Sequence, residues 1–334
     1  MPLKSLIQSE GINVKITSYV KKTTSFWRYI SPEYAYMSTI GDVVRHVYPQ
    51  GRLNGKIIDS QISYRKKWLR KYYSKELSQW RSMSESAVAP TDVDDMPIWF
   101  CWFQGKSTMP ELQRCLYRRL LKNSGNHRVI FVDMQYIIDN DIVPQNVLDG
   151  FNDGIIGPAF FSDIVRVCLL ERFGGLWVDS TLLIAKEIPD SVFEYPMYNV
   201  KGLKDFPFSR NVPDGLNWQS YFLGSFPHSL FVTLLKEMLL KYTSDKLPLI
   251  DYFLVFYLAQ ILREDIPCIC KEFAEIPDNN VLCEQLGPGC ESLNNQDIFL
   301  NILHSDTYVF KLSRHIQYNN DILKILGVDG IEKD

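Results

Sequence analysis

The sequence predicts an α/β fold, a mixed sheet flanked by helices, preceded by a helical N-terminal extension. Residues 97–103 form a continuous apolar run, which is typical of a buried parallel strand. A helical segment over 110–122 separates it from a second apolar run at 129–132, and this is the crossover that parallel strands require. Residues 1–90, in contrast, have helical spacing and many aromatic side chains.

The chain of 334 residues is 46% hydrophobic and 22% charged, but its charge is unevenly distributed. Residues 1–81 hold 15 lysines and arginines against 5 acids, whereas the net charge of the whole chain is -3. Residues 85–96 are small, acidic and contain a proline, as linkers do. We therefore predict a basic helical module over residues 1–90, an α/β domain over 96–326 and a flexible tail over 327–334.

Within the N-terminal module, residues 58–81 have the pattern of a basic amphipathic helix. Either this helix packs on the following domain with its charges in solvent, or it lies on anionic lipid. Nucleic acid is disfavoured as a partner, because no RNA-binding motif accompanies the charge. The predicted partner of residues 58–81 is therefore an anionic membrane surface. The apolar side of this helix consists of Ile62, Leu69, Tyr72, Tyr73 and Trp80.

The localisation that the sequence predicts is cytoplasmic, with association at the inner membrane face. Residues 1–20 lack the apolar core of a signal peptide, since Lys4, Glu10 and Lys15 interrupt it. The longest apolar run, 247–262, contains polar residues and is shorter than the roughly 20 residues that span a bilayer.

A second helix–strand unit follows the first. A helix over residues 159–173 begins after Pro158 and ends at Gly174-Gly175. The strand 176–178 follows, with Asp179 at its carboxyl end, where open α/β sheets bind their ligands. Beyond it we expect strands near 196–200 and 220–225, and helices near 229–241 and 249–263.

Three charged side chains of this unit can converge. Asp163 and Arg166 are three residues apart on the helix and share a face, and the glycine turn returns Asp179 beside them. Two carboxylates and a guanidinium suit a polyhydroxyl ligand, because carboxylates accept from vicinal hydroxyls and the guanidinium donates in a planar fork. The alternative is a structural Asp163–Arg166 pair, worth about 0.2–0.5 kcal/mol.

The segment 160–183 (FFSDIVRVCLLERFGGLWVDSTLL) resembles nucleotide-sugar glycosyltransferases of the GT-A fold. These carry a Ser-Asp-x-x-Arg helix before Gly-Gly-hydrophobic-aromatic-hydrophobic-Asp-x-Asp, and include the fungal initiation mannosyltransferases and the clostridial glucosylating toxins. In particular, the segment is similar to the bacterial capsular polysaccharide synthesis proteins, whose motif ends Trp-hydrophobic-Asp-x-Thr, as residues 177–181 do. Weaker likenesses at 97–105, 249–253 and 309–312 extend the resemblance over about residues 97–315. It implies a GT-A fold, a Rossmann-like nucleotide-diphospho-sugar transferase.

The resemblance also implies roles for individual side chains. Trp102 would stack on the uracil of the donor, and Asp163 and Arg166 would hold hydroxyls of the donor sugar. Asp179 would touch the ribose and a metal ion. A C-terminal element often folds over the diphosphate in this fold, so Lys311, Arg314 or His304 would stabilise the leaving UDP, unless this segment is only a solvated tail. The candidates for the acceptor side are Asn217, Gln219 and Asp251.

The motif departs from Asp-x-Asp at one position, where Thr181 replaces the second carboxylate. Mg²⁺ and Mn²⁺ prefer hard oxygen ligands, and a hydroxyl can ligate Mg²⁺ without adding charge. We therefore expect a weak Mn²⁺ or Mg²⁺ site at Asp179 and Thr181, with His304 as a further candidate ligand. The diphosphate of the donor would complete it.

These expectations describe a retaining glycosyltransferase that moves a hexose from a UDP-sugar, UDP-glucose or UDP-galactose, to a saccharide hydroxyl. The acceptor would be linked to a lipid diphosphate, in the assembly of capsular or other surface polysaccharide. The alternatives are a non-catalytic protein that binds a sugar nucleotide or a membrane surface, and a phosphoryl-transfer enzyme with Asp179 as nucleophile. Thr181 argues against the last, because aspartate-nucleophile phosphatases carry a second aspartate at that position.

Overall fold

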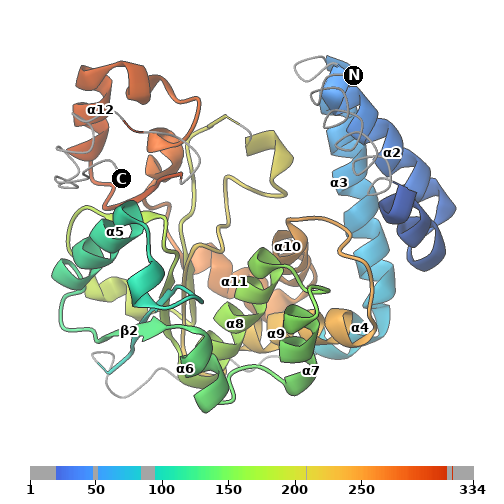
Figure 1. Cartoon of the computed structure of the whole chain (residues 1–334), viewed down its shortest axis with the longest axis horizontal. Coiled ribbons are helices and arrows are strands. Elements are labelled where there is room, and N and C mark those ends of the chain that lie inside the picture. Colours follow the sequence, from blue (N-terminus) through green and yellow to red (C-terminus); the bar gives the residue numbers. More distant parts are fainter. Residues whose placement is uncertain (1–19, 48–51, 84–94, 208, 314–317, 319–334) are drawn as a thin grey trace, which may run out of the picture.

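The computed structural model confirms a mixed α/β architecture with a helical N-terminal region (Figure 1). The predicted tail at 327–334 and most of the predicted linker at 85–96 lie outside the described residues. None of the helices in the described ranges has the length and hydropathy of a membrane span. The structure describes residues 20–47, 52–83, 95–207, 209–313 and 318.

The main sheet has five strands in the order β2-β1-β3-β6-β5. The predicted parallel pairing is confirmed, since β1 pairs in parallel with β2 on one side and with β3 on the other. β6 is antiparallel to β3 and to β5, which makes the sheet mixed. The strands are β1 (Ile98–Cys101), β2 (Val129–Val132), β3 (Gly175–Val178), β5 (Met197–Asn199) and β6 (Phe222–Ser225).

Helices cover both faces of this sheet, as the contacts of two successive residues of β1 show. Successive side chains of a strand point to opposite faces. From β1, Phe100 contacts Tyr117 of α5 (Glu111–Lys122), with ring centroids 4.7 Å apart. The preceding Trp99 contacts Phe173 of α8 (Pro158–Phe173), with ring centroids 5.6 Å apart. The two crossover helices that the sequence predicts therefore lie on opposite faces.

Two glycines bring the end of α8 and the start of β3 close to the rest of the sheet. Gly174 has φ +66, and a Cβ there would lie 2.6 Å from Pro227. Gly175 has φ +96, and a Cβ there would lie 2.1 Å from the carbonyl oxygen of Pro97. Only glycine combines this backbone conformation with such close approach. The Gly-Gly pair thus fixes how Asp179, just after β3, lies relative to α8.

The C-terminal part of the chain returns to the same edge of the sheet. β7 (Val309–Lys311) pairs antiparallel with β4 (Leu182–Ile184), and Lys311 lies opposite Leu182. The strand therefore brings Lys311 close to the segment that carries Asp179.

The other elements connect these parts. The expected helix at 249–263 is α10 and begins later than predicted, because residues 249–253 form a loop instead. The helices are α6 (Met134–Asp139), α7 (Gln145–Asn152), α9 (Leu230–Ser244), α10 (Leu254–Asp265), α11 (Pro267–Glu275) and α12 (Gln296–Leu303). Short 3-10 helices are η1 (Lys106–Thr108), η2 (Asp190–Phe193), η3 (Ser209–Asn211), η4 (Cys283–Leu286) and η5 (Glu291–Asn294).

The N-terminal helices form a layer at one edge of the molecule (Figure 1). A helix over residues 20–29 and α2 (Pro32–Val47) precede α3 (Arg52–Tyr72) and α4 (Ser74–Trp80). The predicted helix at 58–81 is thus divided at Tyr73, whose hydroxyl donates to the carbonyl of Met238 at 2.7 Å.

The apolar side of α3 and α4 is buried rather than available to lipid. Leu69, Tyr73 and Trp80 belong to the same hydrophobic core as α10. The prediction that this apolar side lies on a membrane is therefore wrong, and the alternative, that the helix packs on the following domain, is correct. Because the described parts of 1–90 and 96–326 share one core, their division into separate modules stays a prediction.

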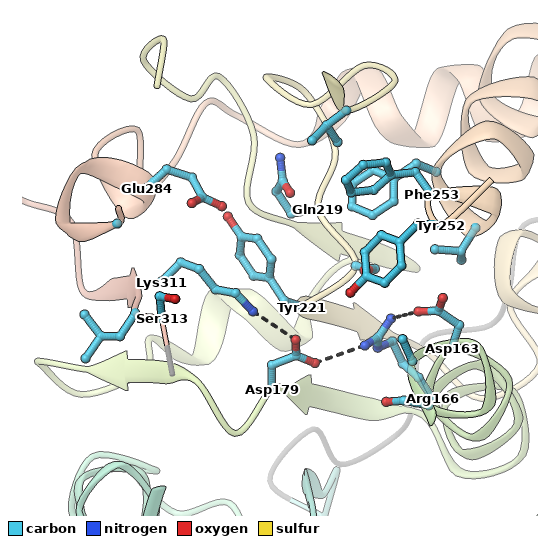
Figure 2. A pocket seen from close by; sticks show the side chains of 18 of the residues that line it. Asp163, Arg166, Asp179, Gln219, Tyr221, Tyr252, Phe253, Glu284, Lys311 and Ser313 are labelled. Atoms are coloured by element: carbon cyan, nitrogen blue, oxygen red, sulfur yellow. Dashed lines mark hydrogen bonds and ion pairs between the residues drawn. The ribbon is translucent and has the colours of Figure 1, made fainter. Parts of the chain in front are cut away.

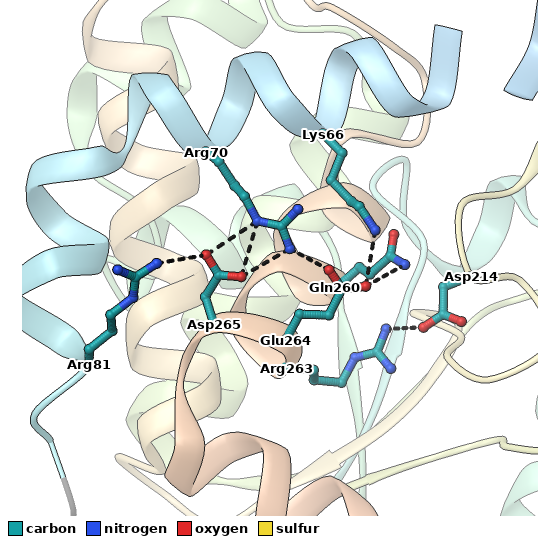
Figure 3. A network of polar contacts seen from close by, with 8 residues as sticks. All are labelled: Lys66, Arg70, Arg81, Asp214, Gln260, Arg263, Glu264 and Asp265. Atoms are coloured by element: carbon teal, nitrogen blue, oxygen red, sulfur yellow. Dashed lines mark hydrogen bonds and ion pairs between the residues drawn. The ribbon is translucent and has the colours of Figure 1, made fainter. Parts of the chain in front are cut away.

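Ion pairs complete the contact between this layer and α10 (Figure 3). Arg70 donates to Asp265 at 3.0 Å and also pairs with Glu264, while Lys66 lies 3.0 Å from Glu264. Arg81 reaches Asp265 at 3.4 Å. These side chains are partly exposed, so each pair contributes little by itself.

Arg65 of α3 makes polar contacts that are more buried than these ion pairs. Its side chain is 10% exposed and lies 2.9 Å from the carboxylate of Asp251. It also donates to the hydroxyls of Tyr34 at 2.7 Å and of Tyr257 at 3.2 Å. Arg65 thereby ties α3 to the loop at 249–253.

We expect Arg65→Met to lower the free energy of unfolding by about 3–5 kcal/mol, since it leaves the carboxylate of Asp251 without its cation in a buried setting. Urea denaturation measures the loss. Lys67→Met, an exposed neighbour on α3, should change stability by less than about 0.5 kcal/mol. The double variant Arg65→Met/Asp251→Asn should recover part of the loss; no recovery would show that the ion pair is not its cause.

Candidate active site

Two adjoining cavities lie at the carboxyl ends of β1 and β3. The first, of about 390 Å³, is lined among others by Asp163, Arg166 and Tyr221. The second, of about 300 Å³, is lined by Trp102 and Thr181 among others. The two cavities share six lining residues, namely Ser162, Asp179, Tyr252, Lys311, Leu312 and Ser313.

Four side chains of alternating charge run along the junction of these cavities (Figure 2). Arg166 donates through Nη1 to Oδ1 of Asp163 at 2.5 Å and through Nη2 to Oδ1 of Asp179 at 3.0 Å. Lys311 donates to Oδ2 of Asp179 at 3.1 Å. We call Asp163, Arg166, Asp179 and Lys311 the charge chain.

Three elements supply the four members of the charge chain. Asp163 and Arg166 lie on α8 at the i and i+3 positions, as the sequence predicts. Asp179 follows β3, and Lys311 comes from β7. The indole of Trp177 donates to Oδ1 of Asp179 at 2.7 Å and lies beneath the guanidinium of Arg166, 5.0 Å from ring centroid to Cζ. The neighbours of Asp179 therefore come from α8, from β3 of the main sheet and from β7 of the second sheet.

The two carboxyl groups have opposite pKa shifts. Burial is the largest influence on Asp163 and, with Asp179 nearby, raises its pKa to about 6 despite Arg166. Burial also acts on Asp179, but Lys311, Arg166 and the indole of Trp177 outweigh it and lower its pKa to about 2. Asp179 is therefore an anion at every physiological pH, whereas Asp163 gains a proton in mild acid.

Arg166 is a positioning residue in this arrangement. It is 3% exposed, and both terminal nitrogens donate to carboxylates. Two groups of the charge chain remain available to a ligand. One is Oδ2 of Asp163, which forms no hydrogen bond within the described residues, and the other is the ammonium group of Lys311. A direct contact between Arg166 and the sugar hydroxyls, which the resemblance implies, stays a prediction.

Trp102 lies in the second cavity, half-buried, with its indole donating to the hydroxyl of Thr108 at 3.1 Å. Lys311 lines the same cavity and Asp163 lines the first, on the other side of Asp179. A flat ring, a cation and a carboxylate therefore follow one another across the two cavities.

The structure separates the three residues expected on the acceptor side. Gln219 lines the first cavity, although its amide donates to the carbonyl of Gly215. Asn217 does not line it and donates to Asp214 at 2.7 Å. Asp251 is not in the lining either, because Arg65 holds its carboxylate.

The structure describes only one of the two other residues that were expected at the diphosphate. His304 ends α12 and is exposed, and it lines neither cavity. Arg314 lies outside the described residues.

Several lining residues escape prediction from the sequence. Glu284 on η4 points toward the hydroxyl of Tyr221 across the first cavity (Figure 2). Burial raises the pKa of both side chains. Tyr252, which is 69% exposed, and Phe253 add aromatic surface at the same cavity. Tyr221 precedes β6, which is antiparallel to β3, so it meets Asp179 at the same sheet edge. Tyr221 could have been predicted if the strand near 220–225 had been paired antiparallel with the strand that precedes Asp179. No local sequence pattern identifies Glu284 as a residue of the site.

The residues predicted to hold a divalent metal do not form such a site by themselves. Asp179 and Thr181 share the second cavity, but Arg166 and Lys311 occupy both oxygens of Asp179. Within the described ranges, no three His, Cys, Asp or Glu side chains are grouped to hold a metal ion. Mn²⁺ or Mg²⁺ therefore stays a prediction that depends on ligands from the substrate.

Comparison with known proteins places the sequence in a family. The sequence profile of the family described as "Capsular polysaccharide synthesis protein" matches residues 50–325. One solved structure, "PaToxG Glycosyltransferase", matches with a TM-score of 0.39 and 14% sequence identity, over 63% of this chain and 83% of that chain. No curated protein sequence gives a significant match. Because the profile covers most of the chain, the protein belongs to the capsular polysaccharide synthesis protein family.

Proposed function

We propose that the chain is a glycosyltransferase that moves a hexose from a UDP-sugar, UDP-glucose or UDP-galactose, to a saccharide hydroxyl. The observation that carries this proposal is the charge chain at the junction of two cavities. Membership of a capsular polysaccharide synthesis family supports it, since building a polysaccharide requires glycosyl transfer.

The order of side chains across the cavities suggests how the donor binds. The uracil would stack on Trp102 in the second cavity, and the hexose would enter the first cavity, where Asp163 accepts from its hydroxyls. The diphosphate would then lie beside Lys311, which lines both cavities. Holding the donor at both ends orients the bond that must break.

In the reaction, the bond between the anomeric carbon and the diphosphate oxygen breaks, and UDP leaves with the electron pair. The acceptor oxygen forms the new bond to that carbon and gives its proton to the departing diphosphate. Lys311 stabilises the growing negative charge on UDP, and Asp163 and Asp179 stabilise the positive charge on the sugar ring. We propose retention of configuration, so that an α-linked donor gives an α-linked product.

The acceptor would approach from the aromatic side of the first cavity. Phe206, Tyr252 and Phe253 line it there, and aromatic faces suit the apolar faces of sugar rings. We propose a saccharide linked to a lipid diphosphate as the acceptor, in the assembly of a capsular or other surface polysaccharide. Arg65, through Asp251, fixes the loop that presents Tyr252.

Release of UDP from a panel of nucleotide sugars, with and without Mn²⁺, tests the proposed function. We expect the chain to release UDP from UDP-glucose or UDP-galactose, and Asp179→Asn to lose at least about 100-fold in turnover. Asp297→Asn, at an exposed position on α12, is the matched control and should retain turnover. Binding without turnover would indicate a non-catalytic protein, and hydrolysis of phosphomonoesters a phosphoryl-transfer enzyme; either would contradict the proposal.

Trp102→Ala should weaken UDP binding by about tenfold or more, because stacking of a base on an aromatic ring is worth about 1–3 kcal/mol. Isothermal titration with UDP measures the change. Trp27→Ala removes an exposed tryptophan on the helix over residues 20–29 and should leave UDP affinity unchanged. Equal affinities of wild type and Trp102→Ala would remove Trp102 from the donor site.

The raised pKa of Asp163 predicts an acid limb in the pH dependence of kcat/KM. Protonation below a pKa of about 6 removes the negative charge that faces the donor sugar, so the rate should rise with pH through about 6 and then level off. Asp179, with a pKa of about 2, adds no limb in this range. A limb near the ordinary aspartate value of about 4 would show that Asp163 is not the titrating group.

A further inference from the structure

The N-terminal layer carries an exposed apolar surface that has no role in the proposed reaction. On the helix over residues 20–29, Val20 is 59% and Trp27 61% exposed. On α2, Tyr36 is 69%, Ile40 36% and Val43 56% exposed. We call these five residues the hairpin patch.

The members of the hairpin patch face the same side of the layer. Contacts of Thr23 with Thr39 at 3.0 Å and of Lys22 with Asp42 at 2.8 Å show that the two helices are antiparallel neighbours. The patch residues are spaced at seven residues on the first helix and at four and three on α2, so each set occupies one helical face. On each helix, the patch residues lie about a third of a turn from the residues that contact the other helix, and the rotation has the same sense on both helices. Because the two helices are antiparallel, an equal rotation in the same sense directs both sets of patch residues to the same side of the layer.

Lysines from α3 flank the hairpin patch on one side. Lys56, Lys67 and Lys71 are exposed and occupy the outward face of α3. α3 is antiparallel to α2, as the bonds from Gln61 to the carbonyl of Met37 at 3.1 Å and between Ser31 and Tyr64 at 2.6 Å show. This lysine face is rotated from the contact with α2 in the same sense as the patch on α2, so it lies on the same side of the layer as the hairpin patch.

Basic side chains also lie on the other flank, and most nearby acids are occupied. Lys21 and Arg28 are exposed on the first helix, next to Trp27. Glu33 is the exposed acid at the rim of the patch. The remaining acids described in residues 20–80 face cations: Asp42 pairs with Lys22, Asp59 with Arg210, and Glu76 lies 4.0 Å from Lys241.

We propose that the hairpin patch and its flanking cations dock on the surface of an anionic lipid bilayer. Tryptophan and tyrosine favour the membrane–water interface, and basic side chains beside them favour anionic headgroups. A protein partner is less suited, since cores of protein interfaces are depleted in lysine. This surface differs from the apolar side of residues 58–81, which is buried. The proposal rests on the helix layer and does not depend on the reaction in the cavities.

Sedimentation of the full chain with vesicles tests the proposal. We expect binding to vesicles that contain phosphatidylglycerol and none to vesicles of phosphatidylcholine alone. Trp27→Ser/Tyr36→Ser should weaken binding at least about tenfold through lost apolar contact, and Lys67→Gln/Lys71→Gln by about fivefold for each lysine. Ile155→Ser, at an apolar position that is 77% exposed and not part of the hairpin patch, is the matched control and should bind as wild type does. No binding, or binding that these variants leave unchanged, overturns the proposal.

The emission of Trp27, taken as the difference between wild type and Trp27→Phe, identifies the occupant of the patch. We expect solvent-like emission without vesicles, then a shift to shorter wavelength and quenching by brominated anionic lipid. Short-wavelength emission without vesicles would contradict the proposal. If that short-wavelength emission depends on protein concentration, a second copy of the chain covers the patch. If it is independent of concentration, another part of the same chain covers the patch. UDP release from a soluble donor should be the same in all variants, so failure of docking is distinct from failure of the proposed function.

Discussion

The double ion pair of Arg166 is the interaction on which the site depends. A single buried guanidinium holds Asp163 from its own helix and Asp179 from the end of the neighbouring strand. Without it, two buried carboxylates would face each other, and like charges in a poorly solvated place are costly. Gly174 and Gly175 allow the turn that makes this contact possible, so the backbone and the charges constrain each other.

The rest of the site is attached to this pair from distant parts of the sequence. Lys311 reaches Asp179 because β7 pairs with β4 just after the motif. Tyr252 is presented by a loop that Arg65 holds through Asp251, so the N-terminal layer also shapes the first cavity. The charge chain has little net charge of its own, because its two carboxylates face two cations. Binding of a diphosphate would give Lys311 a new partner and leave Asp179 more strongly negative toward the sugar.

Local spacing predicts the part of the site that lies within one helix–turn–strand unit. Asp163, Arg166 and Asp179 come together as the sequence predicts, since helical periodicity and a glycine turn are sufficient to place them. Asn217 and Asp251 do not, because their partners, Asp214 and Arg65, are decided by tertiary packing. Glu284 escaped prediction because a short 3-10 helix has no pattern that reveals its neighbours. Periodicity likewise shows that residues 58–81 have an apolar face, but not that α10 covers it.

Arg166 acts through the geometry of its planar fork and not through its charge alone. The most direct measurement is UDP release by Arg166→Lys, compared with Arg172→Lys at an exposed position on the same helix. We predict a loss of at least about 100-fold in kcat/KM for Arg166→Lys, because an ammonium group cannot hold two carboxylates in this geometry. Arg172→Lys should keep wild-type turnover, and circular dichroism should show both variants folded. Wild-type turnover by a folded Arg166→Lys would show that a single positive charge is sufficient at this position.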